Sequence, residues 1–182
     1  MSNPLLVEKA LELAHKKSFQ KSCIPEVGQL LRLLIAGARP GGVAEIGTGC
    51  GVSSAWMLAG LQSYHQFISV EKDRALYQGV SELFANQARA TLILGDWREI
   101  LNHQPFQFIF VDVGEAKDAG ADAVIEAIAL GGLILLDDFT PLHLRADKTD
   151  TRRETWLKDS RLIATEILTT PTTAAILAVK VT

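Results

Sequence analysis

The sequence has little of several features that mark particular classes of protein. It contains only two cysteines, Cys23 and Cys50, too few and too unpatterned for a disulfide scaffold or a zinc site. No apolar run approaches the roughly 18 residues that a membrane-spanning helix needs. Polar and charged residues occur within the first ten positions and leave no apolar stretch long enough for a signal peptide there. These absences favour a cytoplasmic protein that is not attached to a membrane.

Positive charge is also scarce. Lysine and arginine number 18 against 21 aspartates and glutamates, so the formal net charge is −3, and the chain has no basic run and no aromatic-rich basic patch. Such a protein has no general attraction for nucleic acid or for an anionic membrane. The four histidines are scattered without the spacing of metal ligands. We therefore expect neither nucleic acid nor a membrane as a partner.

The composition is that of an ordinary globular protein. With 182 residues, of which 48% are hydrophobic, the chain is long enough for one domain over 1–182 with a substantial core. Two amphipathic helices are expected within 1–38. Apolar runs and helical segments then alternate. The expected strands lie near 43–46, 67–71, 91–94, 106–112 and 132–137. The expected helices lie near 52–62, 74–87, 97–102 and 116–129.

The alternation and the end of the chain together predict the fold class. Continuous apolar strands separated by helices indicate a parallel sheet covered on both faces. Two further strand-like runs, 162–168 and 174–181, are joined by a short turn and must be antiparallel. We expect an α/β fold: a doubly wound, mostly parallel seven-stranded sheet with one antiparallel strand near the C-terminus. Residues 43–137 would form its cofactor-binding part, 162–181 a C-terminal hairpin and 140–150 an exposed loop.

A glycine-rich turn carries the clearest functional signal. Residues 43–53 read VAEIGTGCGVS, an apolar strand, then glycines at 47, 49 and 51, then the start of a helix. Glycines at such a turn let a nucleotide-type ligand lie against bare main chain. A dinucleotide fingerprint requires its third glycine at position 52, which is Val52. The spacing therefore makes a nicotinamide oxidoreductase improbable and resembles the first motif of class I S-adenosylmethionine-dependent methyltransferases.

Acidic residues follow or end the predicted parallel strands, where ligands bind in open α/β sheets. Glu71 could accept the two ribose hydroxyls, although Lys72 beside it is also consistent with a solvated strand end. Asp96 could cap a helix and contact an adenine amino group, with Trp97 as an apolar wall. Ser53 could cap its helix or bind a ligand carboxylate. The remaining acids at these ends are Glu45, Asp112, Asp137 and Asp138.

Three of these acids could hold a metal ion. Asp112, Asp137 and Asp138 end two neighbouring strands, and clustered carboxylates repel one another unless a proton or a cation offsets the charge. Oxygen ligands favour Mg²⁺, Ca²⁺ or Mn²⁺. The alternative is that Asp138 caps a loop and Asp137 is a solvated strand end.

From Ser22 to Lys180 the chain resembles the small cation-dependent O-methyltransferases, the catechol and caffeoyl-CoA O-methyltransferase group. The segments that carry the resemblance are PEVGQLL (25–31), EIGTGCGVS (45–53), VE (70–71), GD (95–96), FIFVD (108–112) and GGLILLDD (131–138). The resemblance implies a small-molecule methyl acceptor, S-adenosylmethionine, a divalent cation on Asp112, Asp137 and Asp138, and Asp112 as the catalytic residue. The cofactor residues expected are Glu45, Gly47, Thr48, Gly49, Gly51, Ser53, Glu71, Lys72, Asp96, Trp97 and Asp112.

Two positions depart from the family pattern. The family ends its fifth strand in Asp-Asn, where this chain has Asp137 and Asp138. It also has a catalytic lysine at the position of Glu115, and Lys117 could reach the site only through a rearranged loop. A cation-independent methyltransferase and a non-catalytic S-adenosylmethionine-binding protein are the alternatives. The apolar residues of the N-terminal helix could pack on the sheet or form a homodimer.

Overall fold

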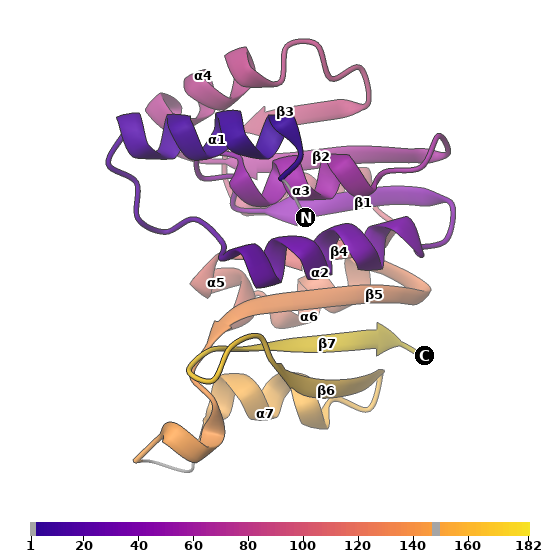
Figure 1. Cartoon of the computed structure of the whole chain (residues 1–182). Helices are drawn as coiled ribbons and strands as arrows, with labels where there is room; N and C mark the ends of the chain where they lie inside the picture. Colours follow the sequence, from indigo (N-terminus) through magenta and orange to yellow (C-terminus); the bar gives the residue numbers. More distant parts are fainter. Residues whose placement is uncertain (1–2, 147–149) are drawn as a thin grey trace.

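One seven-stranded sheet forms the centre of the computed structural model, which describes residues 3–146 and 150–182 (Figure 1). The strand order is β3-β2-β1-β4-β5-β7-β6. All neighbours from β3 to β5 are parallel, and β7 is antiparallel to both β5 and β6. The predicted fold class is confirmed. The strands are β1 (Gly41–Ile46), β2 (His65–Glu71), β3 (Ala90–Leu94), β4 (Phe106–Val111), β5 (Ile128–Phe139), β6 (Leu162–Leu168) and β7 (Ala174–Lys180).

The central strands are apolar throughout because both of their faces are covered. In β4, Phe108 and Phe110 pack in one cluster with α2 (Pro25–Ala36) and α3 (Val52–Gly60). Ile109 and Val111 point the other way, since successive side chains of a strand alternate, and they pack in a second cluster. A half-exposed strand would instead alternate apolar and polar residues. The continuous apolar runs therefore already indicate that helices cover both faces of the sheet.

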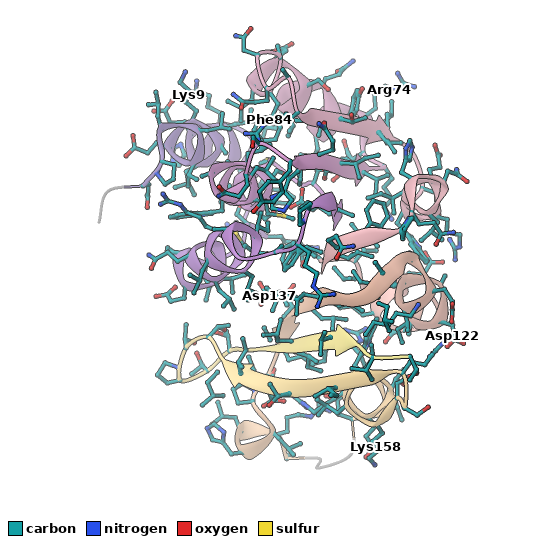
Figure 2. All side chains as sticks on the ribbon, turned by 90° about the vertical axis from the view of Figure 1, so that its right-hand side faces the viewer. Lys9, Arg74, Phe84, Asp122, Asp137 and Lys158 are labelled. Atoms are coloured by element: carbon teal, nitrogen blue, oxygen red, sulfur yellow. The ribbon has the colours of Figure 1, made fainter. Side chains whose placement is uncertain are left out.

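Helices lie on both sides of this sheet, as Figures 1 and 2 show. On one side α1 packs against α3 and α4, and α2 also packs against α3. On the other side the cluster around Trp156 contains residues of η1 and the last three α-helices. None of the helices within the described residues is long and apolar enough to cross a membrane. The remaining helices are α1 (Leu5–Lys16), α4 (Arg74–Leu83), η1 (Trp97–His103), α5 (Gly114–Lys117), α6 (Ala121–Ala127), η2 (Leu142–Leu144) and α7 (Thr151–Lys158).

Two expected boundaries were wrong. The helix expected over 116–129 is divided into α5 and α6 and ends at Ala127, so that β5 starts four residues before the expected 132. Helix α7 was not expected. The loop expected over 140–150 contains η2, and its residues 147–149 lie outside the described part of the chain.

The register of the parallel strands brings four chain segments to one edge of the sheet. Ile46 pairs with Val70 on one side and with Val111 on the other, and Val111 pairs with Leu136. The residues that follow this row are therefore neighbours at the carboxyl edge. They are Gly47, Glu71, Asp112 and Asp137. The chain reverses its direction of winding between β1 and β4, which is where open α/β sheets bind ligands.

Candidate active site

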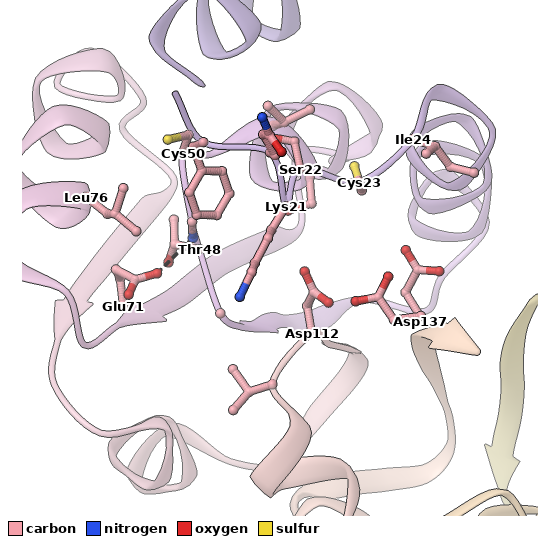
Figure 3. A pocket seen from close by; sticks show the side chains of 18 of the residues that line it. Lys21, Ser22, Cys23, Ile24, Thr48, Cys50, Glu71, Leu76, Asp112 and Asp137 are labelled. Carbon is pink, nitrogen blue, oxygen red and sulfur yellow. Dashed lines mark hydrogen bonds between the residues drawn. The ribbon is translucent and has the colours of Figure 1, made fainter. Parts of the chain in front are cut away.

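A pocket of about 710 Å³ lies at this carboxyl edge. Its volume is within the range of small-molecule sites. The glycine turn after β1, Glu71 and the ends of β4 and β5 all contribute to its lining. The link between α1 and α2 also lines it, together with the start of α3 and Leu76 of α4 (Figure 3). Thr173, just before β7, completes the described lining. The pocket thus joins parts of the sequence that are far apart.

The glycine turn needs glycine for two physical reasons. Gly47 and Gly49 have φ angles of +99° and +55°, in the region that side chains with a Cβ rarely adopt. A Cβ at Gly47 would also lie 2.9 Å from Cγ2 of Val113. The turn therefore presents bare backbone to the pocket, and the residues after it start α3.

Glu71 is fixed beside this turn by two backbone groups. The N–H of Gly49 donates to its Oε2 at 2.8 Å, and the N–H of Asp73 donates to its Oε1 at 2.8 Å. The side chain turns into the pocket (Figure 3). Each carboxylate oxygen has a second lone pair, so Glu71 can accept further hydrogen bonds from a ligand diol. The neighbouring Lys72 also lines the pocket but is exposed.

Glu45 lies under the turn and is fully buried. The hydroxyls of Ser54 and Ser69 donate to its Oε2, and the Ser69 hydroxyl also pairs with that of Thr48 at 2.5 Å. Burial raises the pKa of Glu45 to about 7, although hydrogen bonds from serines, including Ser53, oppose the rise. Glu45 supports the turn from below rather than lining the pocket.

Asp137 and Asp138 both line the pocket although they are consecutive residues. Consecutive side chains of a regular strand point to opposite faces. The pairing of β5 with β7 shifts register between Leu136 and Phe139, and Asp138 has a φ of +64°. Bulges of this kind redirect side chains next to functional sites. The local distortion therefore brings two carboxylates to the site from one strand end.

Asp112 faces these two acids across the end of the sheet (Figure 3). Burial raises the pKa of the Asp112 carboxyl; the ammonium of Lys117 opposes the rise, and the charges of Asp138 and Asp137 add to it. Burial likewise raises the pKa of Asp137. With its pKa raised to about 8, the Asp112 carboxylate is, once ionised, a stronger base than an ordinary aspartate.

Lys117 reaches this cluster, which the sequence allowed only through a rearranged loop. Its side chain is almost fully buried, its Nζ donates to the backbone oxygen of Asp137 at 2.7 Å, and it lies 3.7 Å from Oδ1 of Asp112. The short helix α5 turns the chain back after Val113, which places Lys117 under the strand ends. The sequence gives no signal for this, because a four-residue helix has no apolar periodicity.

Four expected cofactor residues are absent from the described lining of the pocket: Glu45, Gly51, Asp96 and Trp97. The first two belong to the strand and turn that form the pocket's base, whereas the other two lie at the start of η1. Asp96 caps η1 by accepting from the N–H of Arg98, and Trp97 is buried in the core. The Trp97 ring packs directly against Gly120: a Cβ at that position would lie only 2.5 Å from the ring. The capping role weighed for Asp96 is confirmed, and the apolar-wall role of Trp97 has no support in its position.

The segment 19–24 was missed as a pocket wall. It links α1 to α2 without regular structure and lines one side of the pocket. Lys21 extends from it into the pocket (Figure 3). The ring of Phe19 lies against Gly49, where a Cβ would meet it at 3.1 Å. One indirect signal for this segment was present in the sequence, the resemblance of the following helix to the methyltransferase family. A link without hydrophobic periodicity does not reveal where it lies in the fold.

Comparison with known proteins agrees with this geometry. A model of the methyltransferase domain family matches residues 44–139, from β1 to the end of β5. A protein of Mycolicibacterium smegmatis provisionally named an O-methyltransferase is 32% identical over 162 residues, which cover 81% of this chain and 75% of that one. A similarly named Mycobacterium ulcerans protein is 30% identical over 122 residues, 62% of this chain and 54% of that one. The chain thus matches only about half of some relatives' length.

Solved structures share the fold at lower identity. The O-methyltransferase of Bacillus cereus, solved in complex with S-adenosylhomocysteine, has a TM-score of 0.80 at 21% identity, covering 99% of this chain and 92% of its own. The O-methyltransferase TomG of Streptomyces achromogenes, solved with S-adenosylmethionine, has a TM-score of 0.80 at 19% identity, covering 100% and 92%. Because the family model covers the strands and turns that build the pocket, this chain belongs to the methyltransferase domain family.

Proposed function

We propose that this protein transfers the methyl group of S-adenosylmethionine to a hydroxyl oxygen of a small molecule. The observation that carries the proposal is the position of Glu71: its carboxylate is held by the glycine turn and faces the 710 Å³ pocket. A diol-accepting carboxylate beside bare backbone fits the ribose and the adjacent groups of a nucleoside cofactor. The O-methyltransferase names of the relatives and the cofactors in the two solved complexes support the same reading.

The charge of the pocket also fits this cofactor. Glu71, Asp112, Asp137 and Asp138 bring acidic groups to the lining, whereas its lysines are Lys21 and Lys72. A sulfonium carries one positive charge, which a ring of carboxylates attracts. Ser53 lies at the start of α3, where a backbone N–H or its hydroxyl can bind the cofactor's carboxylate.

The transfer itself is a displacement at the methyl carbon. The acceptor oxygen forms a bond to that carbon while the carbon–sulfur bond breaks, and the electron pair of that bond stays on sulfur. The hydroxyl proton passes to the carboxylate of Asp112, which we assign as the base. Holding the two reactants in line can lower the barrier by roughly 7–11 kcal/mol. Exclusion of water by the segment 19–24 would assist this alignment.

A divalent cation does not fit the arrangement of these residues. Asp112, Asp137 and Asp138 line the pocket together, but among the described residues no group of three or more His, Cys, Asp or Glu side chains is placed to hold a metal ion. The ammonium of Lys117 already lies 3.7 Å from Asp112. The proposed reaction therefore has no metal-dependent step.

Two variants separate binding from chemistry. Asp112→Asn should reduce methyl transfer at least a hundredfold, since it removes the base, while calorimetric affinity for S-adenosylhomocysteine stays within about threefold. Gly47→Val should remove that affinity, because its Cβ meets Val113 and its φ is unfavourable. The acceptor panel would comprise catechols, simple phenols and hydroxy acids. Absence of S-adenosylhomocysteine binding, or tight binding without transfer to any of them, would contradict the proposal.

A further inference from the structure

Lys117 is the buried cation of the pocket's acidic end. Only 2% of the residue is exposed, and the described part of the pocket lining does not include it. Its ammonium therefore lies behind the carboxylates rather than in the cavity. Burial of a lone ammonium is strongly unfavourable unless opposite charge and hydrogen-bond acceptors compensate it. Here the backbone oxygen of Asp137 and the carboxylate of Asp112 provide both.

The backbone of Lys117 is also fixed from two directions. Its N–H donates to the oxygen of Val113 at 3.1 Å, which closes α5. Its own carbonyl oxygen accepts from the indole Nε1 of Trp156 at 2.9 Å, and Trp156 is fully buried in α7. The lysine is thus held in place by α7 and by the end of β5, not by solvent.

These carboxylates need a positive charge near them. Asp112, Asp137 and Asp138 carry up to three negative charges at neighbouring strand ends, and such groups repel one another. We propose that the Lys117 ammonium is a built-in countercharge that takes the place of a divalent cation, so that cofactor binding and methyl transfer need no added metal. Lys117 acts as a positioning residue, because it holds Asp112 without touching the reacting groups. This inference rests on the proposed function.

The test uses three full-length proteins: the wild type, Lys117→Met and Lys158→Met. Lys158 is the matched control, since it is an exposed lysine that pairs with Glu154 on the surface of α7. Mn²⁺ is titrated into each protein saturated with S-adenosylhomocysteine, and bound Mn²⁺ is measured by electron paramagnetic resonance. S-adenosylhomocysteine affinity is measured separately with EDTA and with Mg²⁺.

We expect the wild type and Lys158→Met to bind S-adenosylhomocysteine equally, within twofold, in EDTA and in Mg²⁺. Neither should show saturable Mn²⁺ binding below millimolar concentration. Lys117→Met leaves the three carboxylates without their countercharge. It should therefore gain a Mn²⁺ site at least tenfold tighter than any in the wild type, an effect that a purely structural lysine would not produce.

Three outcomes overturn the inference. One is wild-type Mn²⁺ binding below millimolar concentration that Asp112→Asn removes. Another is wild-type turnover lost in EDTA and restored by Mg²⁺. The third is a folded Lys117→Met protein without any gain in Mn²⁺ affinity. If Lys117→Met does not fold, the Mn²⁺ titration of the wild type and its activity in EDTA still test the inference. Failure of the wild type to bind S-adenosylhomocysteine contradicts the proposed function instead.

Discussion

At the scale of single residues, the glycine turn rests on a carboxyl group that is absent from the described pocket lining. Glu45 is fully buried under the turn, and its Oε1 accepts no hydrogen bond from the described residues. Its other oxygen accepts hydrogen bonds from the hydroxyls of Ser54 and Ser69. The Ser69 hydroxyl is in turn hydrogen-bonded to the hydroxyl of Thr48 in the turn. The protonation of Glu45 is therefore linked to the stability of the turn.

The raised pKa of Glu45 gives a pH dependence of defined sign. The folded state binds the proton more tightly than the unfolded state, so stability falls as pH rises from about 4.5 towards about 7 and is level above that. The difference corresponds to roughly 3 kcal/mol at full ionisation. Urea unfolding of the wild type and Glu45→Gln at pH 5 and pH 8 measures it. Between these pH values the wild type should lose about 2–3 kcal/mol relative to the variant, because part of the loss has already occurred at pH 5. Equal losses would show that Glu45 does not titrate in this range.

At the scale of elements, α7 is attached to the sheet by a buried arginine as well as by its buried tryptophan. The guanidinium of Arg153 is 5% exposed and donates to Glu166 in β6, to Asp150 and to the backbone oxygen of Thr140. Trp156 lies one turn further along the same helix and is fully buried. The helix thus joins the region after β5 to the C-terminal hairpin, and it holds Lys117 through Trp156.

Two adjacent arginines provide a matched comparison in α7. Arg153→Met removes the arginine that pairs with the partly buried Glu166 and one of the two arginines that pair with Asp150, and it should lower the free energy of unfolding by about 3 kcal/mol. Arg152 is 36% exposed and pairs with the exposed Asp118, so Arg152→Met should change it by less than about 1 kcal/mol. Urea unfolding of both variants at one pH measures the difference. Similar small losses in both would mean that the Arg153 network contributes little.

The elements differ in how far the sequence could predict them. Strand β4 was predictable because FIFV is apolar on every residue, as a doubly covered strand must be. The boundary between α6 and β5 was not, since AVIEAIAL satisfies both a helix and a strand pattern. Helix α7 reads TRRETWLK, too polar to show an apolar face, and it forms because tertiary contacts bury Arg153 and Trp156.

The site was predictable where it follows from strand ends. Gly47, Glu71 and Asp112 come directly after paired strand residues, so the topology alone brings them together. Trp97 is absent from the described pocket lining, and its ring packs against Gly120, a contact with a residue distant in sequence that the sequence alone could not predict. Lys21 was missed because it comes from a link without regular structure. Lys117 was expected to reach the site only through a rearranged loop, because the sequence gives no signal for the four-residue helix α5.

At the scale of the whole molecule, ligand binding should stabilise the entire sheet. The pocket lining joins the glycine turn after β1, Glu71, the ends of β4 and β5, Thr173 before β7 and the link between α1 and α2. A ligand that binds only the folded state adds RT ln(1 + [L]/Kd) to its stability. Because a bound ligand would contact segments that are far apart in the chain, the unfolding of any one of them should weaken ligand binding.

Thermal unfolding measures this linkage. S-adenosylhomocysteine at a hundred times its Kd contributes about 2.7 kcal/mol, which should raise the Tm of a chain of this length by roughly 5–10 °C. The same concentration of NAD should cause no shift, since Val52 occupies the place of the third dinucleotide glycine. Glu71→Ala should lose most of the shift. An equal shift with NAD would contradict the assigned ligand class.

The link between α1 and α2 forms one side of the pocket, whereas the glycine turn and the acidic strand ends belong to the sheet. The groups that we assign to the methyl donor are thus encoded between Glu45 and Asp138, and the opposing surface is encoded before Pro25. Homologous exchange of the first two helices could therefore alter which acceptor is admitted while the donor half of the enzyme stays intact.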